Sequence, residues 1–285
     1  DKMILSLNDF VVIKSNWKRK SENINNIIKT INILPEHSAF LDDSVYEINE
    51  VNRKIPDLNV CRLIPEKNFS KKFNEFFVLN DSLKTKEDSK KTKMYKQEFK
   101  RENKKNSTNN LDQYLKELKI ILKIKINSSD NLDRISQLTQ KVNQFNSTSL
   151  RMSKQDVKNF IKNKNNFVFQ VEAKDIYGDY GIIGLAFVEF KKDKEAKISN
   201  FLFSCRAIGR EIEDYFLYNV INFINQKKKN KIYLYFQFNE KNKVAKEYFV
   251  NKRIIKKTNN KLQKFSIGIN NFKNVKKKLI KCQIN

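Results

Sequence analysis

The chain has 285 residues, which is long enough for two domains with buried cores of their own. Apolar residues make up 39% of it and charged residues 32%, a composition typical of globular proteins with a polar surface. No apolar run reaches the roughly 18 residues that a membrane-spanning helix needs, so no membrane span is expected. Three distant cysteines predict neither a disulfide framework nor a paired metal site, and a reducing cytoplasm is the simplest compartment.

The formal net charge of +26 would by itself suggest a polyanionic partner. The lysines, however, are spread over the whole chain among asparagines and isoleucines, as an AT-rich genome would encode them. No recognition-helix pattern, zinc-finger spacing or aromatic RNA-binding motif accompanies them. We therefore expect no specific nucleic acid partner, although such a surface would speed association with an acidic protein.

The first 80 residues alternate between strand and helix patterns. This order predicts a parallel sheet with crossover helices, in which ligands bind beyond the carboxyl ends of the strands. Asp42 and Asp43 end the second expected strand and would lie there. The strands are expected at residues 10–14, 38–43 and 59–64, and the helices at residues 20–33 and 46–55.

Residues 81–110 are highly charged and lack an apolar period, which predicts a solvated helical linker between a domain at residues 1–80 and another at residues 111–285. In the second domain a helix and a strand cover residues 111–127, two helices follow, and then a three-stranded antiparallel meander. The two helices are expected at residues 134–145 and 153–162, and the meander strands at residues 167–174, 181–190 and 196–204. Beyond them we expect a helix at residues 209–226, a strand at 231–238, a helix at 243–249 and a strand at 262–267.

Three segments of the second domain are more specific: "RISQLTQKVNQFNSTSLRMS" from Arg134, "DIYGDYGIIG" from Asp175 and "SCRAIGREIE" from Ser204. Together they resemble the carboxy-terminal half of the FkbH-like family, in which a haloacid-dehalogenase (HAD) phosphatase domain precedes an acyltransferase-like domain of the GNAT type. The resemblance implies an α/β fold: a partial Rossmann-like HAD domain with a parallel sheet, followed by a GNAT-like α+β domain. It also implies that the chain is amino-terminally truncated, starting within the phosphatase domain.

In the phosphatase domain the resemblance implies a magnesium-dependent site. Asp42 and Asp43 would bind Mg²⁺, which prefers oxygen ligands, and Lys20, after an Asn-Trp pair, would balance the anionic charge. The nucleophile motif of the family, Asp-x-Asp, stands upstream of this arrangement, and no suitable copy precedes Lys20. We therefore expect no aspartyl-phosphate chemistry from the chain as it stands, whereas a longer parent protein would have it.

In the acyltransferase-like domain Arg206, Gly209 and Arg210 match the turn at which GNAT proteins bind the pyrophosphate of coenzyme A with backbone N–H groups. Glu211 stands where a small residue is expected and should disfavour a pyrophosphate. The phosphopantetheine arm of a carrier protein, with one phosphodiester, is the alternative cofactor. The thiol of Cys205 would carry the acyl group as a thioester if the neighbouring arginines lowered its pKa, although a cysteine at such a place is often only a small apolar residue.

Amide side chains suit the recognition of a small polyhydroxylated acyl group. The resemblance places Gln140, Asn143, Gln144, Asn146 and Asn242 in such a pocket, although turn and cap chemistry is the plainer explanation. Asp175 would serve as a base or simply hold its hairpin turn. A phenylalanine, Phe249, occupies the place of the usual GNAT tyrosine, so a tyrosine acid is not expected there.

The family activity implied by the resemblance starts from a small phosphorylated acyl substrate, 1,3-bisphosphoglycerate. The glyceryl group passes to the phosphopantetheine thiol of an acyl carrier protein, and phosphate is lost. Two alternatives stay open. One is an acyl-CoA-dependent N- or O-acyltransferase of surface-glycan biosynthesis, and the other is a non-catalytic domain that binds an acidic carrier protein.

Overall fold

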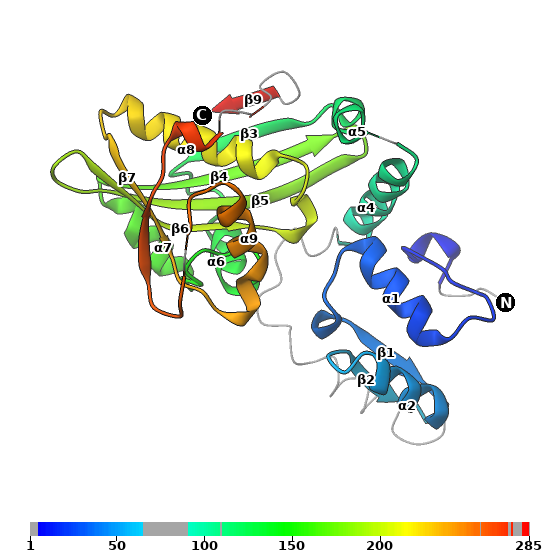
Figure 1. The fold of residues 1–285 in the computed structure, drawn as a ribbon. Coiled ribbons are helices and arrows are strands. Elements are labelled where there is room, and N and C mark those ends of the chain that lie inside the picture. Colours follow the sequence, from blue (N-terminus) through cyan, green and yellow to red (C-terminus); the bar gives the residue numbers. More distant parts are fainter. Residues whose placement is uncertain are drawn as a thin grey trace. The chain divides into compact units, whose positions relative to one another are not determined.

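The computed structural model describes residues 5–64, 91–108, 110–256, 258–272, 275 and 281–284 (Figure 1). The chain forms two compact units, residues 1–109 and residues 110–285, and each is described by itself. Residues 81–90 of the expected linker lie outside the described residues.

Unit 1 contains a parallel pair of short strands, β1 (Ala39–Asp42) and β2 (Asn59–Arg62), joined by the helix α2 (Val45–Lys54). The helix α1 (Lys20–Ile31) ends at Asn32, whose left-handed backbone stops the helix. A small core forms where α1, α2 and the start of β2 meet, and its buried residues are Ile28, Val51, Ile55 and Leu58. This parallel strand–helix–strand unit agrees with the expected element order, but two described strands do not show a complete HAD domain.

The strand expected at residues 10–14 is wrong, because this segment has irregular backbone after a short 3₁₀ turn, η1 (Leu7–Asp9). Phe10 and Ile13 are 46% and 56% exposed, and no strand among the described residues pairs with this segment. An apolar run forms a strand only where a neighbour can take its backbone hydrogen bonds.

The second half of the expected linker is the helix α4 (Lys91–Asn106), which packs beside α1 in unit 1. Most of its side chains are charged, yet Glu98 and Arg101 are almost fully buried and form an ion pair with an N···O distance of 3.3 Å. The segment is therefore helical, as expected, but part of it is packed against its surroundings rather than solvated.

Unit 2 is built on one sheet with the strand order β8-β7-β6-β5-β4-β3-β9. The pairs β6–β7 and β3–β9 are parallel, and the other neighbours are antiparallel. The strands are β3 (Ile121–Ile126), β4 (Asn166–Asp175), β5 (Gly178–Phe190), β6 (Glu195–Phe203), β7 (Lys231–Phe236), β8 (Gln263–Ser266) and β9 (Lys281–Ile284). The helices are α5 (Leu111–Leu118), α6 (Leu132–Lys141), α7 (Lys154–Lys162), α8 (Ile212–Gln226) and α9 (Lys243–Asn251).

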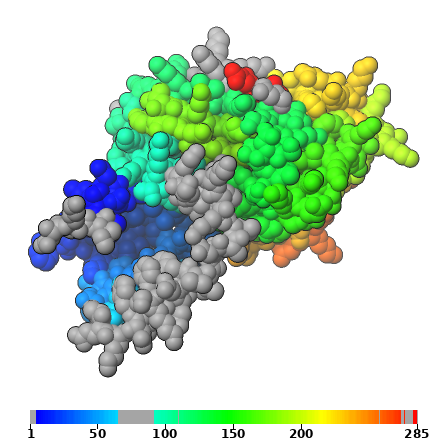
Figure 2. Space-filling model, turned by 180° about the vertical axis from the view of Figure 1, so that it is seen from behind, coloured from blue at the N-terminus to red at the C-terminus, as the bar shows by residue number. Residues whose placement is uncertain are grey.

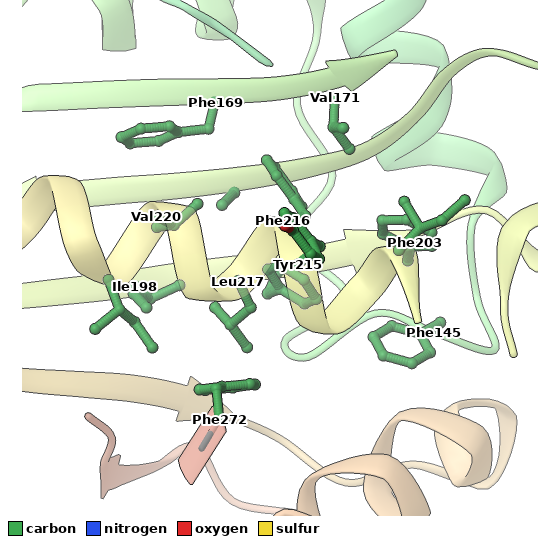
Figure 3. Close-up of a cluster of buried hydrophobic side chains, with 14 of the residues drawn as sticks. Phe145, Phe169, Val171, Ile198, Phe203, Tyr215, Phe216, Leu217, Val220 and Phe272 are labelled. Atoms are coloured by element: carbon green, nitrogen blue, oxygen red, sulfur yellow. The ribbon is translucent and has the colours of Figure 1, made fainter. Parts of the chain in front are cut away.

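Helices cover both faces of this sheet (Figure 1). The larger core lies under α5, α8 and α9, where Phe216 and Val220 of α8 pack among Phe169, Val171 and Phe203 of the strands (Figure 3). The smaller core lies under α6 and α7, whose green residues form a continuous surface in Figure 2. The mixed α/β fold and the order of helices and strands agree with the GNAT-like domain predicted from the sequence.

Two predicted details of the helices can be compared directly with the structure. The capping box at the start of α7 is present, since Ser153 accepts from the Asp156 N–H and Asp156 accepts from the Ser153 N–H. The preceding helix ends at Lys141 instead of residue 145, because the chain turns there and Phe145 enters the core. The strand β9 was not predicted, since Lys281–Ile284 is too short and polar to show a strand pattern.

Close packing explains why the second motif has a glycine at position 184. A Cβ atom at this position in β5 would lie 2.5 Å from ring carbons of Phe203 and 2.9 Å from Cγ1 of Val171. Only glycine therefore lets these two core side chains pack across the sheet.

Candidate functional site

The parallel strands β6 and β7 separate after four paired positions, Glu195–Ile198 with Lys231–Leu234. Beyond that point the edge of β6 is covered by a segment that follows α6, residues 145–147. The Phe203 N–H donates to the Phe145 carbonyl at 2.8 Å, and the Ser147 N–H donates to the Phe201 carbonyl at 2.9 Å. On the other side, the Gln237 N–H after β7 donates to the Ser147 carbonyl at 2.8 Å. This inserted segment therefore bridges the carboxyl ends of the two strands.

Asn146 and Asn242 hold the inserted segment, and both are fully buried. The Asn242 amide nitrogen donates to the carbonyls of Asn146 and Gln237, each at 2.9 Å. Asn146 donates to the Val142 carbonyl at 3.0 Å and accepts from the Ser149 N–H at 2.9 Å. The two amides predicted to contact substrate thus bond to backbone, where they satisfy groups that would otherwise be buried and unpaired.

The other predicted pocket amides lie at the end of α6 and just after it. Arg151 donates to the Asn143 side chain and to the Gln140 carbonyl, and the Gln140 amide nitrogen lies 3.4 Å from the Met152 carbonyl. The Gln144 carbonyl accepts from the Ala245 N–H at 3.1 Å. Within the described residues the half-buried Gln144 side chain makes no hydrogen bond, so it differs from the neighbouring amides.

The third motif forms the turn between β6 and α8. Cys205–Ala207 is a single 3₁₀ turn, η5, and Gly209 and Glu211 have positive φ angles of 80° and 59°. The Gly209 N–H points to the side chain of Glu213 in the first turn of α8 and donates to its Oε1 at 3.0 Å. The backbone amide that was expected to face a phosphate is therefore bonded to a carboxyl group of the chain itself.

The two arginines of this turn also have internal contacts. Arg210 is 4% exposed, donates to the Arg206 carbonyl, and lies 5.6 Å above the centre of the Tyr180 ring. Arg206 is half-buried, and its Nε lies 3.4 Å from the Ser204 hydroxyl. The position of Arg210 does not favour the predicted phosphate-binding role, because its guanidinium faces the protein.

Glu213 is 6% exposed, and its second oxygen accepts no hydrogen bond from the described residues. Burial raises the pKa of this carboxyl from 4.5 to about 7, although the N–H groups of Gly209 and Glu213 itself act in the opposite direction. The nearby charges are Asp214, which raises the pKa further, and Lys252, which lowers it. Glu213 therefore changes its protonation state near neutral pH.

Asp175 and Cys205 were predicted to take part in catalysis. One oxygen of Asp175 accepts from the N–H groups of Tyr177 and Gly178, and the other accepts from the Tyr180 hydroxyl at 2.7 Å. Asp175 therefore closes its hairpin turn and is poorly placed as a base. Cys205 is a half-buried cysteine outside any disulfide, just beyond the carboxyl end of β6, and its role as acyl carrier stays a prediction.

A polar cluster that the sequence reasoning did not predict joins α8 to α9. The Tyr248 hydroxyl donates to Asp214 at 2.7 Å, and Lys252 forms an ion pair with the other oxygen of Asp214. Burial, followed by the charge of Asp214, raises the pKa of Tyr248 well above 10. The only sequence signal was the tyrosine next to Phe249, which was expected to point elsewhere. Its hydroxyl is committed to Asp214, so Tyr248 is a poor proton donor to substrate.

In unit 1, Lys20 and Asp42 lie together, as predicted, and form an ion pair. Asp42 also accepts from the Ser44 N–H at 2.9 Å. Burial acts to raise the pKa of Asp42, but the hydrogen bonds from Lys20 and Ser44 outweigh it and lower the pKa on balance. Asp43 is engaged through its backbone, since its carbonyl accepts from Arg62 at 3.1 Å.

A Mg²⁺ site needs several oxygen ligands. Among the described residues no group of three or more His, Cys, Asp or Glu side chains could hold a metal ion. Asp42, moreover, is already paired with a cation. The described residues therefore do not fit a complete Mg²⁺ site, and the metal-binding role of Asp42 and Asp43 stays a prediction.

Two shallow hollows on unit 2 lie away from the β6–α8 turn. One, of about 590 Å³, is lined by residues after α9 and in β8, including Arg253 and Lys264. The other, of about 490 Å³, lies between Phe238 and Lys246 and the loop before β8. Neither hollow is lined by Cys205 or Arg206. The residues predicted from the sequence therefore do not line either hollow.

No known protein family matches the chain, and no curated protein sequence matches it. Three solved structures with some likeness to the chain have TM-scores of 0.38 to 0.40. A domain from Methanocaldococcus jannaschii (TM-score 0.40, 9% identity) covers 51% of this chain and 97% of its own length. A variant of spermidine N-acetyltransferase from Vibrio cholerae (0.39, 12%) covers 54% and 96%, and the ribosomal-protein alanine N-acetyltransferase from Escherichia coli (0.38, 10%) covers 52% and 94%.

Two of these three names describe acetyl transfer, as in the acyltransferase alternative, and none describes a phosphatase or a transferase that uses a carrier protein. Scores this low decide neither fold nor function. No helix in the described part of the chain has the length and apolar character needed to cross a bilayer.

Proposed function

We propose that unit 2 is an acyltransferase domain whose site lies at the carboxyl ends of β6 and β7. The observation that carries this proposal is the parallel β6–α8–β7 crossover, in which the two strands stop pairing after Ile198 and Leu234 while β6 runs on to Phe203, just before the turn at Cys205. In α/β sheets, ligands bind outside the carboxyl ends of such strands. Two of the three motifs that resemble the FkbH-like family meet at this place, namely residues 145–147 and the turn before α8.

The chemistry proposed for this site is acyl transfer through a thioester. The Cys205 thiolate would attack an activated acyl carbon, forming a C–S bond. The bond to the leaving group breaks at the same time, and the leaving group is phosphate for an acyl phosphate or a free thiol for a thioester donor. Before the attack the Cys205 thiol must lose its proton to solvent or to a base, and a thiol leaving group takes up a proton as it departs. The acyl group then passes to the final acceptor, and the Cys205 thiol is regenerated.

Mass spectrometry of the intact protein tests this step. Incubation with an acyl phosphate, an acyl-CoA or an acyl-pantetheine should add one acyl group at Cys205, and the label should disappear in Cys205→Ser. Cys61 and Cys282 are matched controls, since both are free, half-buried thiols. Equal labelling of all three cysteines, or labelling that survives Cys205→Ser, would show that the thiol has no special role.

Phosphatase activity has less support. The pairing of Lys20 with Asp42 agrees with the FkbH-like resemblance, but the described residues supply too few metal ligands. The function that the geometry supports best is therefore acyl transfer by unit 2. The proposal covers two kinds of donor, an acyl-CoA and an acyl group bound to a carrier protein.

A further inference from the structure

The start of α8 has the features of an anion site. Gly209 has a φ of 80°, a backbone conformation that favours glycine, and its N–H lies just before the first helical turn. Free N–H groups and the helix dipole at such a place attract a negative group. In this chain that group is already present, because Glu213 is buried and its Oε1 lies 3.0 Å from the Gly209 nitrogen.

An external phosphate could not share this place with Glu213. The Gly209 N–H has its acceptor, and a second anion would meet the charge of the carboxylate in a buried setting where screening is weak. The Arg210 guanidinium is 4% exposed, donates to the Arg206 carbonyl and lies over the Tyr180 ring, so it is engaged within the protein. Glu211, by contrast, is half-exposed at the N-cap and does not occupy the Gly209 N–H.

We propose that Glu213 is a specificity-determining residue: it fills the anion site at the start of α8 and excludes acyl donors that are held by a diphosphate. This inference rests on the proposed acyltransferase function and deepens it. The donor that fits is one recognised along an uncharged arm, as in an acyl group on pantetheine, and not by the diphosphate of a nucleotide. Glu213, not Glu211, is then the residue that discriminates.

Calorimetric titration of the full chain with coenzyme A and with pantetheine tests the inference. The buffer should be at pH 8, where Glu213 is ionised, and at about 0.3 M salt, so that the many exposed lysines are screened. We expect the wild type to bind the two compounds with affinities within about threefold of each other. Glu213→Ala, which vacates the site, should bind coenzyme A at least tenfold more tightly and pantetheine unchanged.

Two further variants separate occupancy from charge. Glu213→Gln retains an acceptor for Gly209 and should gain less than Glu213→Ala. Glu211→Gln removes the same charge from the same turn without opening the site and should resemble the wild type. Far-UV circular dichroism of each variant checks folding. If Glu213→Ala does not fold, the wild-type comparison still decides, because a coenzyme A affinity tenfold or more above that of pantetheine overturns the inference.

The same measurements distinguish this inference from the proposed function. Tight diphosphate-dependent binding by the wild type, together with acyl labelling of Cys205, would overturn the role of Glu213 and leave acyl transfer standing. The reverse outcome has two parts: the wild type binds coenzyme A weakly and Glu213→Ala strengthens this binding, but the protein is never acylated. That outcome would support the role of Glu213 at this site and refute the proposed function.

Discussion

Burial of Glu213 should make the stability of unit 2 depend on pH near neutrality. The carboxyl has a pKa of about 7 in the folded chain and an ordinary value of 4.5 when exposed. Between these values the folded protein binds a proton that the unfolded chain has lost, so the free energy of unfolding falls as pH rises. At about 1.4 kcal/mol for each pKa unit, the loss between pH 4.5 and pH 8 is about 3 kcal/mol.

Glu213→Gln should remove this dependence, because the amide does not titrate. Urea unfolding followed by circular dichroism at several values between pH 5 and pH 8.5 measures it. As pH rises, the free energy of unfolding of the wild type should fall relative to that of the variant, by about 3 kcal/mol in all. The charged and titratable groups facing Glu213, namely Asp214, Lys252 and Tyr248, are the same in both proteins. The chain has a single histidine, His37 in unit 1, so few other side chains contribute in this range.

Glu240→Gln is a control, because the pKa of Glu240 is shifted in the opposite direction to that of Glu213. The hydrogen bond from Lys243 lowers the pKa of Glu240, so its contribution is present at neutral pH and is lost on acidification. The Glu240→Gln variant should therefore lose stability between pH 5 and pH 8.5 just as the wild type does. A difference between wild type and Glu213→Gln that stays constant from pH 5 to pH 8.5 would refute the reasoning about burial.

Three further predictions concern structural residues. Gly184→Ala should destabilise unit 2 by about 2 kcal/mol, because its Cβ would overlap the Phe203 ring, while Gly268→Ala, with no atom within 4 Å, should stay within about 0.5 kcal/mol in the same urea titration. Asn242→Ala should cost about 2–4 kcal/mol, since the buried Asn146 carbonyl and the partly buried Gln237 carbonyl lose their donor, and should lower the thermal midpoint. Lys20→Met should cost about 1 kcal/mol or less, because Lys20 is partly exposed, and the cost should shrink as pH falls below 4 and Asp42 takes up a proton.

Much of the fold follows from apolar spacing. Ile24, Ile28 and Ile31 recur at helical spacing in α1, and the antiparallel strands β4, β5 and β6 show their apolar runs clearly. The strand expected at residues 10–14 failed for a different reason, since a run of apolar residues does not specify a pairing partner. The strand β9 forms against β3 although its own residues are polar, so its position depends on tertiary contacts that a local pattern cannot show.

The candidate site was harder to predict than the fold. The location of the turn before α8 was expected, but Glu213 was overlooked, although a carboxylate in the first turn of a helix after a glycine is a recognisable signal. Glu211 was given the role of repelling phosphate because it stands where GNAT proteins have a small residue. Only the coordinates show which of the two carboxylates bonds to the Gly209 N–H.

The amide-rich segment after α6 shows how residues that resemble a family motif can serve mainly to hold the backbone. The Asn146 side chain bonds to the backbone of Val142 and Ser149 within its own segment, whereas the Gln144 side chain makes no hydrogen bond within the described residues. We therefore expect Gln144→Ala to keep the thermal midpoint while weakening acyl labelling of Cys205, and Asn146→Ala to lower the midpoint by several degrees. Thermal unfolding and mass-spectrometric labelling of the same samples separate the two effects. Equal loss of stability in both variants would mean that Gln144, too, only supports the fold, and that substrate recognition lies elsewhere.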